Sequence, residues 1–243
     1  MGHARIAIVT AISAFGSDRD TPPLVAALEA LGIACDHVAW DDPTVSWGRF
    51  DAAVLRSPWN YSEQRSAFVA WAQRVARVTR LVNPAQVVAW NTDKRYLAEL
   101  QASGLAVVES HFIAPEEAID ALPGFDEFVV KPTVAAGSRG AARFTHRQLP
   151  QALAHARQLQ SQGCHVMVQP YLSGVDTEGE TALVYFDGQF SHAVRKSALL
   201  GTDGSRRCSQ SAPEVITPCA ASQTQRGLAD AVLVETGELL ALQ

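Results

Sequence analysis

Strand-type and helix-type segments alternate through the first 85 residues of this chain. The short apolar runs RIAIVTA, ACDHVAW and FDAAVLRSP have the character of strands. Helical apolar spacing marks TPPLVAALEALG, which starts with prolines and ends on glycine, and SEQRSAFVAWAQRVARV, with Ser62 as the expected cap and Phe68, Trp71 and Val75 on one face. Such alternation predicts a mostly parallel sheet covered on both faces, with ligands beyond the strand carboxyl ends. We therefore expect a small α/β domain at residues 1–85.

A different pattern begins near residue 86. The stretch NTDKRYLAELQASGL opens with polar capping residues and closes on Gly104, which predicts a helix of about three turns with Lys94 near its start. Strand-type runs follow, interrupted by one helical stretch, RQLPQALAHARQLQSQG. Asp187 and Gly188 stand between two of these runs and are the strongest short-range signal for a hairpin. The second part is therefore predicted to be α+β, with an antiparallel sheet.

Composition excludes several classes of protein. With 243 residues and 47% hydrophobic content, the chain can bury the core of one large or two smaller domains. It has no long uncharged apolar run and no signal-peptide pattern, so we expect a cytoplasmic protein with no membrane partner. A net charge of −5 with scattered basic residues argues against nucleic acid as a partner. The cysteines form no CxxC pair and are expected to be free thiols: Cys35, Cys164, Cys208 and Cys219.

The stretch FVVKPTVAAGSRG, residues 128–140, reads as a strand that delivers a cation beside a flexible loop. Lys131 lies among apolar residues, where an unpaired cation is costly, so it needs an anionic partner. Gly137, Ser138 and Gly140 allow backbone N–H groups to approach phosphate oxygens closely. The combination indicates a polyphosphate site. The alternative is a buried strand that ends in an ordinary turn.

The order of these motifs resembles the ATP-grasp superfamily over about residues 5–218. A helix-start lysine, a strand lysine and the glycine–serine loop are followed by VMVQPYLSGVDTEGE and AVRK. The segments RSPWNY, WNTDKRYL, VVKPTVAAGSRG and EGETALVYFDGQFSHAVRK are similar to small ATP-grasp ligases of the D-cycloserine synthetase type, which are O-ureido-serine cyclo-ligases. The resemblance implies an ATP-grasp fold: the Rossmann-like (pre-ATP-grasp) domain at 1–85, a central ATP-lid subdomain at 86–168, and an incomplete C-terminal subdomain at 169–243.

The same resemblance implies a function in antibiotic biosynthesis. The implied activity is that of an ATP-dependent carbon–nitrogen ligase that acts through a phosphorylated intermediate, with intramolecular ring closure as one form of the reaction. The implied partners are ATP and a small amino-acid-like substrate, and a homo-oligomer is left open. The alternative function is an ATP-binding protein, or a truncated fragment, without ligase activity.

The resemblance also assigns a nucleotide site. Lys94 and Lys131 would touch the α- and β-phosphates, and the loop 135–140 would fold over the β- and γ-phosphates. A hinge would meet the adenine edge with its backbone, and one of two carboxylates would accept hydrogen bonds from the ribose, because a carboxylate offers several acceptor positions. The implied nucleotide-binding residues are Lys94, Lys131, Ala136, Gly137, Ser138, Gly140, Gln169, Pro170, Tyr171, Leu172, Asp176 and Glu180.

Two further groups complete the expected site. The resemblance implies that Arg195 and Lys196, at the end of the hairpin, face the γ-phosphate or the acyl-phosphate as the catalytic pair. Arg56, Trp59 and Tyr61 follow the third strand of the first domain, at an end that favours ligands. There a guanidinium grips a carboxylate in two-point fashion and the aromatic rings form an apolar wall, so these three are the expected substrate residues.

Each assignment has a structural alternative. Lys94 also fits a solvated helix surface, and the two aromatic residues of RSPWNY also fit ordinary packing. Asp176 and Glu180 are alternative candidates for the ribose role, and Glu180 also fits a polar turn before the hairpin. His192 reads as a packed or surface histidine rather than a base.

Ligands for the expected cofactor Mg²⁺ are not found in the sequence. ATP-grasp enzymes bind one or two Mg²⁺ ions through an acid on one late strand and paired acids or an acid and an amide, two residues apart, on the next. After SAPEVITP the chain offers only CAASQTQRGLADAVLVETGELLALQ, in which Glu235 and Glu238 lack the ligand spacing. The metal ligands are therefore unknown. Truncation, a last part that is not included, and nucleotide binding without completed chemistry are the three explanations.

Overall fold

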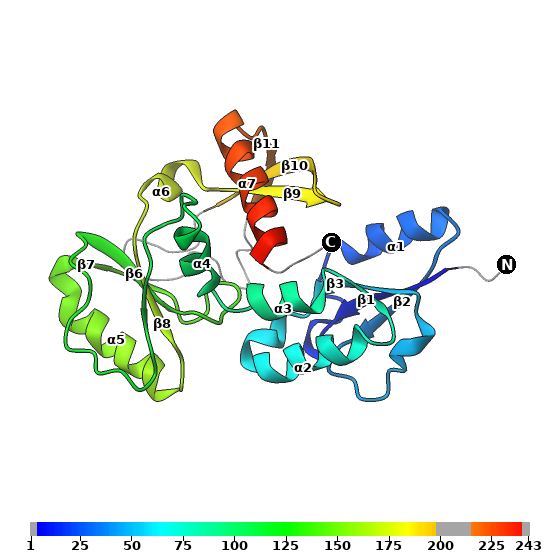
Figure 1. Cartoon of the computed structure of the whole chain (residues 1–243), viewed down its shortest axis with the longest axis horizontal. Coiled ribbons are helices and arrows are strands. Elements are labelled where there is room, and N and C mark those ends of the chain that lie inside the picture. Colours follow the sequence, from blue (N-terminus) through cyan, green and yellow to red (C-terminus); the bar gives the residue numbers. More distant parts are fainter. Residues whose placement is uncertain (1–3, 198–214, 240–243) are drawn as a thin grey trace. The chain divides into compact units, whose positions relative to one another are not determined.

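The chain divides between Asp93 and Lys94 into two units in the computed structural model, which describes residues 4–197 and 215–239 (Figure 1). Each unit contains its own sheet and its own buried apolar cluster. The finer division predicted at residues 85 and 168 stays a prediction. Of the cysteines, Cys208 lies outside the described residues, and the other three are free thiols.

The first unit is built on a parallel sheet with the strand order β2-β1-β3-β4. Its strands are β1 (Arg5–Thr10), β2 (Ala34–Ala39), β3 (Ala52–Ser57) and β4 (Arg80–Val82). Its helices are α1 (Thr21–Ala30), α2 (Arg65–Val75) and α3 (Ala85–Asn91). Parallel neighbours need crossover connections, and the helices α1 and α2 provide them. The predicted α/β architecture is confirmed.

Helix α2 buries the face that its sequence predicts. Phe68, Trp71 and Val75 are almost fully buried, and Trp40 packs edge-on against the first two of them. The predicted cap, Ser62, is wrong. The chain after Pro58 winds into a 3₁₀ turn at Trp59–Glu63, so Ser62 lies inside that turn and the helix begins only at Arg65.

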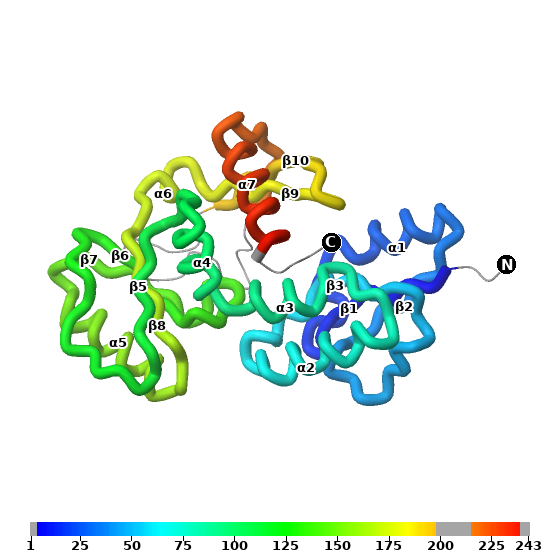
Figure 2. The backbone as a smooth tube through the Cα atoms, in the orientation of Figure 1, coloured from blue at the N-terminus to red at the C-terminus, as the bar shows by residue number. Residues whose placement is uncertain are grey.

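The second unit contains two antiparallel sheets, which Figure 2 traces through the backbone. The four-stranded sheet, in the order β5-β8-β6-β7, consists of β5 (His111–Ile113), β6 (Glu127–Pro132), β7 (Ala142–Thr145) and β8 (Val166–Pro170). The three-stranded sheet, in the order β11-β10-β9, consists of β9 (Glu180–Phe186), β10 (Gln189–Lys196) and β11 (Ile216–Cys219). The helices are α4 (Tyr96–Ala102), α5 (Leu149–Ser161), α6 (Gly174–Glu178) and α7 (Gln223–Leu239).

The strand β6 uses its two faces for different purposes. Phe128 and Val130 are fully buried in the cluster beneath α5, which covers one face of the sheet (Figure 1). Because side chains alternate along a strand, Val129 and Lys131 point to the opposite face. The α5 side therefore anchors the strand, and the other face is available for a ligand.

The hairpin prediction is confirmed and the helix prediction around Lys94 is partly wrong. Asp187 and Gly188 both have positive φ, at 50° and 70°, as a two-residue turn of this type requires.

The helix that was expected to span about three turns is α4, which starts only at Tyr96. Lys94 precedes it, and its backbone N–H donates to the carbonyl of Thr133 at 3.0 Å instead of joining a helix. The lysine is therefore fixed to the end of β6.

Gly179 connects α6 to β9 at a point where no side chain fits. Its φ is 73°, and an added Cβ would meet the carbonyl oxygen of Lys196. Gly188 has a similar φ of 70° but open space around it. Substitution of each of these two glycines therefore distinguishes the cost of a steric clash from the cost of backbone strain.

We expect Gly188→Ala to lower the free energy of unfolding by about 1 kcal/mol, because alanine resists positive φ. Gly179→Ala is expected to cost about 2 kcal/mol more, because the backbone of β10 must also shift. Thermal unfolding monitored by circular dichroism measures both variants. Equal midpoints for the two would contradict the close approach at Gly179.

Candidate active site

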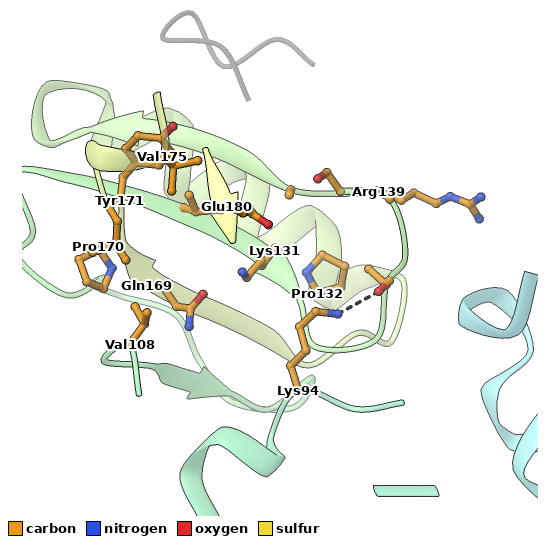
Figure 3. Close-up of a pocket in the computed structure, with 16 residues that line it drawn as sticks. Lys94, Val108, Lys131, Pro132, Arg139, Gln169, Pro170, Tyr171, Val175 and Glu180 are labelled. Carbon is orange, nitrogen blue, oxygen red and sulfur yellow. Dashed lines mark hydrogen bonds between the residues drawn. The ribbon is translucent and has the colours of Figure 1, made fainter. Parts of the chain in front are cut away.

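A pocket of about 280 Å³ opens on the face of the four-stranded sheet that carries Lys131 (Figure 3). It brings together residues that are far apart in the sequence. The predicted nucleotide-binding residues among its lining are Lys94, Lys131, Gly137, Ser138, Gln169, Pro170, Tyr171, Leu172 and Glu180. The other predicted residues, Ala136, Gly140 and Asp176, are near in sequence but do not line it.

Two lysines reach this pocket from different elements. Lys131 extends from β6, and Lys94 extends from the turn before α4 and donates from Nζ to the carbonyl of Ala135 at 2.9 Å (Figure 3). Burial, and then the charge of Lys94, lower the pKa of Lys131 to about 8, while Glu180 acts in the opposite direction. Two ammonium groups in one partly desolvated pocket repel each other, so a polyanion fits them.

The glycine–serine loop is held at both ends. At its start the carbonyl of Ala135 accepts the hydrogen bond from Lys94, and at its end the carbonyl of Gly140 lies 2.9 Å from Nε2 of His155 on α5. Between these points Gly137 and Ser138 have φ values of 59° and 57°. Backbone turns of this kind form concave sites that bind anions through N–H groups, so the loop fits a phosphate chain.

The end of β8 and the residues that follow it form the opposite wall of the pocket. Gln169 is nearly buried, and its side-chain amide donates to the hydroxyl of Ser110 at 2.8 Å. Tyr171 is fixed by its backbone N–H, which donates to the carbonyl of Glu127 at 2.8 Å. Valine side chains complete this wall: Val108, Val129 and Val175. An apolar wall with a few oriented polar groups suits a flat heterocyclic base.

The two candidates for the ribose acceptor lie in different surroundings. Glu180 lines the pocket, near the ammonium end of Lys131 (Figure 3). The carboxylate of Asp176 instead accepts hydrogen bonds from the Tyr171 hydroxyl at 2.9 Å and from Nη1 of Arg143 at 2.8 Å. A ribose role for either carboxylate stays a prediction.

The sequence reading missed two arginines near this site. Arg139 lines the pocket from the loop, and Arg143 on β7 is almost completely buried behind Tyr171. An arginine inside the strand-type run AARFT is a usable signal, because a cation on a sheet needs carboxylate partners. Those partners, Glu127 and Asp176, are too distant in sequence to be paired with it by pattern.

Arg195 and Lys196 line a second cavity, of about 380 Å³, together with Asp176 and the residues around Gly179. Nη1 of Arg195 donates to the carbonyl of Glu178 at 2.6 Å, and its Nε is buried without a partner. Lys196 is directly opposite Glu180 in the register of β10 and β9. The pair is therefore adjacent in the sheet to a residue of the first pocket, and its catalytic role stays a prediction.

The three predicted substrate residues belong to the first unit, at the carboxyl end of β3. Nη2 of Arg56 forms ion pairs with Asp18 and Asp20, each at 3.2 Å, and its Nε is buried without a partner. Trp59 is 46% exposed, which leaves its ring accessible. Tyr61 packs against Phe68, with ring centroids 5.6 Å apart. Their substrate roles stay predictions.

Within residues 4–197 and 215–239, no three His, Cys, Asp or Glu side chains gather as a metal site would require. Glu235 accepts a hydrogen bond from the hydroxyl of Ser103, and Glu238 is exposed. These two residues do not provide the set of oxygen ligands that Mg²⁺ requires. Within the same residues, no helix has the length and apolar character needed to span a bilayer.

Solved structures with this architecture define the class of protein. D-alanine–D-alanine ligase from Bacillus anthracis, in a crystal structure complexed with ATP, superposes with a TM-score of 0.67 over 98% of this chain and 78% of the ligase, at 13% identity. A RimK domain ATP-grasp protein from Sphaerobacter thermophilus superposes with a TM-score of 0.56 over 96% of this chain and 98% of that chain, at 16% identity. The fold is therefore the predicted ATP-grasp fold.

Closer relatives identify the family. The cycloserine biosynthesis protein DcsG of Streptomyces lavendulae is 41% identical over 207 residues, which are 82% of this chain and 69% of the relative. The crystal structure of D-cycloserine synthetase DcsG has a TM-score of 0.89 and 38% identity, over 99% of this chain and 83% of that chain. The family described as D-cycloserine synthetase DcsG, N-terminal domain, matches residues 6–83. The chain belongs to the D-cycloserine synthetase family and is an ATP-dependent ligase.

The lowered pKa of Lys131 predicts how ATP affinity depends on pH. In the ligand-free protein this ammonium loses its proton as the pH rises through about 8. Bound phosphates favour the charged form and raise the pKa again, so binding above this pH must take up a proton. We expect the ATP affinity to fall by about tenfold from about pH 7 to about pH 9.

Calorimetry in buffers with different ionisation enthalpies measures both the affinity and the proton uptake. The variant Lys131→Met is the control, since it has no ammonium to titrate and its weaker binding should be nearly flat over this range. An equal pH dependence in parent and variant would assign the effect to another group.

Proposed function

We propose that this chain is an ATP-dependent carbon–nitrogen ligase that acts on a small amino-acid-like substrate through a phosphorylated intermediate. One observation carries the proposal: Lys94 and Lys131 converge on one pocket between the glycine–serine loop and the segment Gln169–Leu172. Lysines that converge beside a loop of this kind suit a triphosphate, and the apolar wall suits the attached base.

The proposed reaction has two steps. A carboxylate oxygen of the substrate attacks the γ-phosphorus of ATP, and ADP leaves with the electrons of the broken bond. A nitrogen then attacks the acyl carbon, inorganic phosphate leaves, and the nitrogen loses a proton. The protein's contribution is mainly positioning and charge neutralisation, because phosphoryl transfer needs little covalent help. Lys94 and Lys131 would neutralise the phosphates, and Arg195 and Lys196 would face the transferring group.

Membership of the D-cycloserine synthetase family supports a narrower form of this proposal. Cycloserine is a cyclic amino-acid derivative, so the attacking nitrogen and the activated carboxyl group would belong to one molecule. The chain would then be an intramolecular cyclo-ligase in antibiotic biosynthesis, with O-ureido-serine as the first substrate to test. The reacting nitrogen of that substrate carries a carbamoyl group, so formation of cycloserine also requires water, which removes the group as carbon dioxide and ammonia. The proposed location is the cytoplasm, where ATP is supplied.

The proposal is tested by ADP release with the 243-residue chain in a buffer that contains Mg²⁺. We expect ADP to form only when ATP and a suitable amino-acid substrate are both present, with a ring-closed product detected by mass spectrometry. Lys131→Met should weaken ATP binding by about 2 kcal/mol or more, because the phosphates lose a partly desolvated charge partner. Arg147→Met, at an exposed residue after β7, is the matched control.

The outcomes of this assay distinguish a ligase from a protein that only binds the nucleotide. ATP binding without ADP release, for all amino-acid substrates tried, would favour the nucleotide-binding function without ligase activity. Unchanged ATP affinity in Lys131→Met would remove that lysine from the site.

The substrate carboxylate is proposed to bind Arg56 by exchange with Asp20. Asp18 is nearly buried and holds the guanidinium, whereas Asp20 is 82% exposed and shares the same Nη2. An exposed ion pair contributes little stability, so an incoming carboxylate can replace Asp20 at small cost. The planar guanidinium carries further N–H donors for two-point contact.

Arg56→Lys is therefore expected to raise the KM of the amino-acid substrate, or to lower kcat, by at least about tenfold, with the KM of ATP unchanged. Asp20→Asn, which removes the competing charge, should lower the substrate KM by about threefold. Steady-state kinetics with each substrate varied in turn measure both. Parent-like turnover in Arg56→Lys would make Arg56 structural and would place the carboxylate site elsewhere.

A further inference from the structure

Three side chains behind the nucleotide pocket contact one another, and we call them the Arg143 cluster: Arg143, Tyr171 and Asp176. Cζ of Arg143 lies 3.5 Å from the centroid of the Tyr171 ring. Nη1 of the same guanidinium donates to Oδ2 of Asp176 at 2.8 Å, and the Tyr171 hydroxyl donates to Oδ1 of Asp176 at 2.9 Å. Each member therefore contacts both of the others.

The cluster is attached to the sheet at its base. Nε of Arg143 donates to Oε1 of Glu127 at 2.7 Å, and the backbone carbonyl of Glu127 accepts from the N–H of Tyr171. The Arg143 side chain is only 5% exposed, and the hydrogen bond to Glu127 raises its pKa further, so it stays charged. A buried cation with two carboxylate partners and a ring stacked on it has little freedom to move.

This arrangement fixes the part of the chain that forms one wall of the pocket. Tyr171 lines the pocket, whereas Arg143 does not, so the arginine acts through the tyrosine. Asp176 lies on α6, directly after the segment Gln169–Leu172. We propose that Arg143 is a positioning residue that holds Tyr171 and Asp176 together and thereby orients the wall that binds the base of the nucleotide. This inference rests on the proposed ATP site.

Because Arg143 lies behind one wall of the pocket, we expect its loss to affect only the part of the ligand that this wall binds. The phosphate end of the pocket is formed by Lys94, Lys131 and the loop, whereas the Arg143 cluster joins β7 to the segment that forms the other wall. Loss of Arg143 should therefore weaken binding of the base and leave binding of the phosphates intact. Inorganic tripolyphosphate is the probe for the phosphate end alone.

The experiment compares the affinities of the full chain for ATP and for tripolyphosphate by calorimetry. For Arg143→Met we expect the ATP affinity to fall by at least about tenfold while the tripolyphosphate affinity is unchanged. Lys131→Met should weaken both ligands, and the exposed control Arg147→Met should weaken neither. Arg143→Lys, which keeps the charge but not the planar fork, should recover part of the ATP affinity.

Two results would overturn the positioning role: equal losses for ATP and tripolyphosphate in Arg143→Met, or no loss for either. Tyr171→Phe is the second variant, in case Arg143→Met does not fold. It removes only the hydroxyl bonded to Asp176, and a smaller loss for ATP with none for tripolyphosphate is expected; no loss for ATP would count against the cluster. A parent chain that binds neither ligand would instead overturn the proposed ATP site itself.

Discussion

The alternation of side chains along β6 is the constraint on which the site depends. Phe128 and Val130 are fully buried on one face, and Lys131 emerges on the other. The neighbouring strand β8 is paired in register with β6, so that Val129 is opposite Gln169. A slip of one residue would send the lysine into the apolar cluster, where its charge would have no partner. The packing against α5 thus fixes the strand and, with it, the direction of the cation.

Local patterns predicted the parts of the fold that depend on neighbouring residues. The parallel sheet of the first unit follows from alternating strand and helix segments, and the hairpin follows from Asp187 and Gly188. The errors arose where distant residues compete with local preference. Ser62 has the chemistry of a cap, but the 3₁₀ turn after Pro58 takes it away from the helix end. The backbone of Lys94 bonds to Thr133, which delays the start of α4 to Tyr96.

The candidate site shows the same division between local and distant information. The lysines and the glycine–serine loop were recognisable from sequence because each has a chemical role that its own neighbours reveal. The partners of Arg143 and Arg56 were not, because Asp176 lies 33 residues from the former and Asp18 lies 38 residues from the latter. A sequence pattern does not show how far apart such residues lie in the folded chain. Only the folded strands and turns bring these charges together.

Lysine and arginine serve different purposes in this chain. Of its 20 basic residues, the only lysines are Lys94, Lys131 and Lys196, and each of them lines one of the two cavities described above in the second unit. Arginines form several of the described ion pairs, such as those of Arg143 with Glu127 and Asp176. A guanidinium stays charged and binds in a fixed planar geometry, which suits a permanent link between elements. An ammonium is a compact charge whose pKa responds to its surroundings. The charge of Lys94 helps to lower the pKa of Lys131, and a polyphosphate would attract both ammonium groups. The buried Arg143 therefore links elements of the fold, whereas Lys94 and Lys131 offer their charge to the ligand.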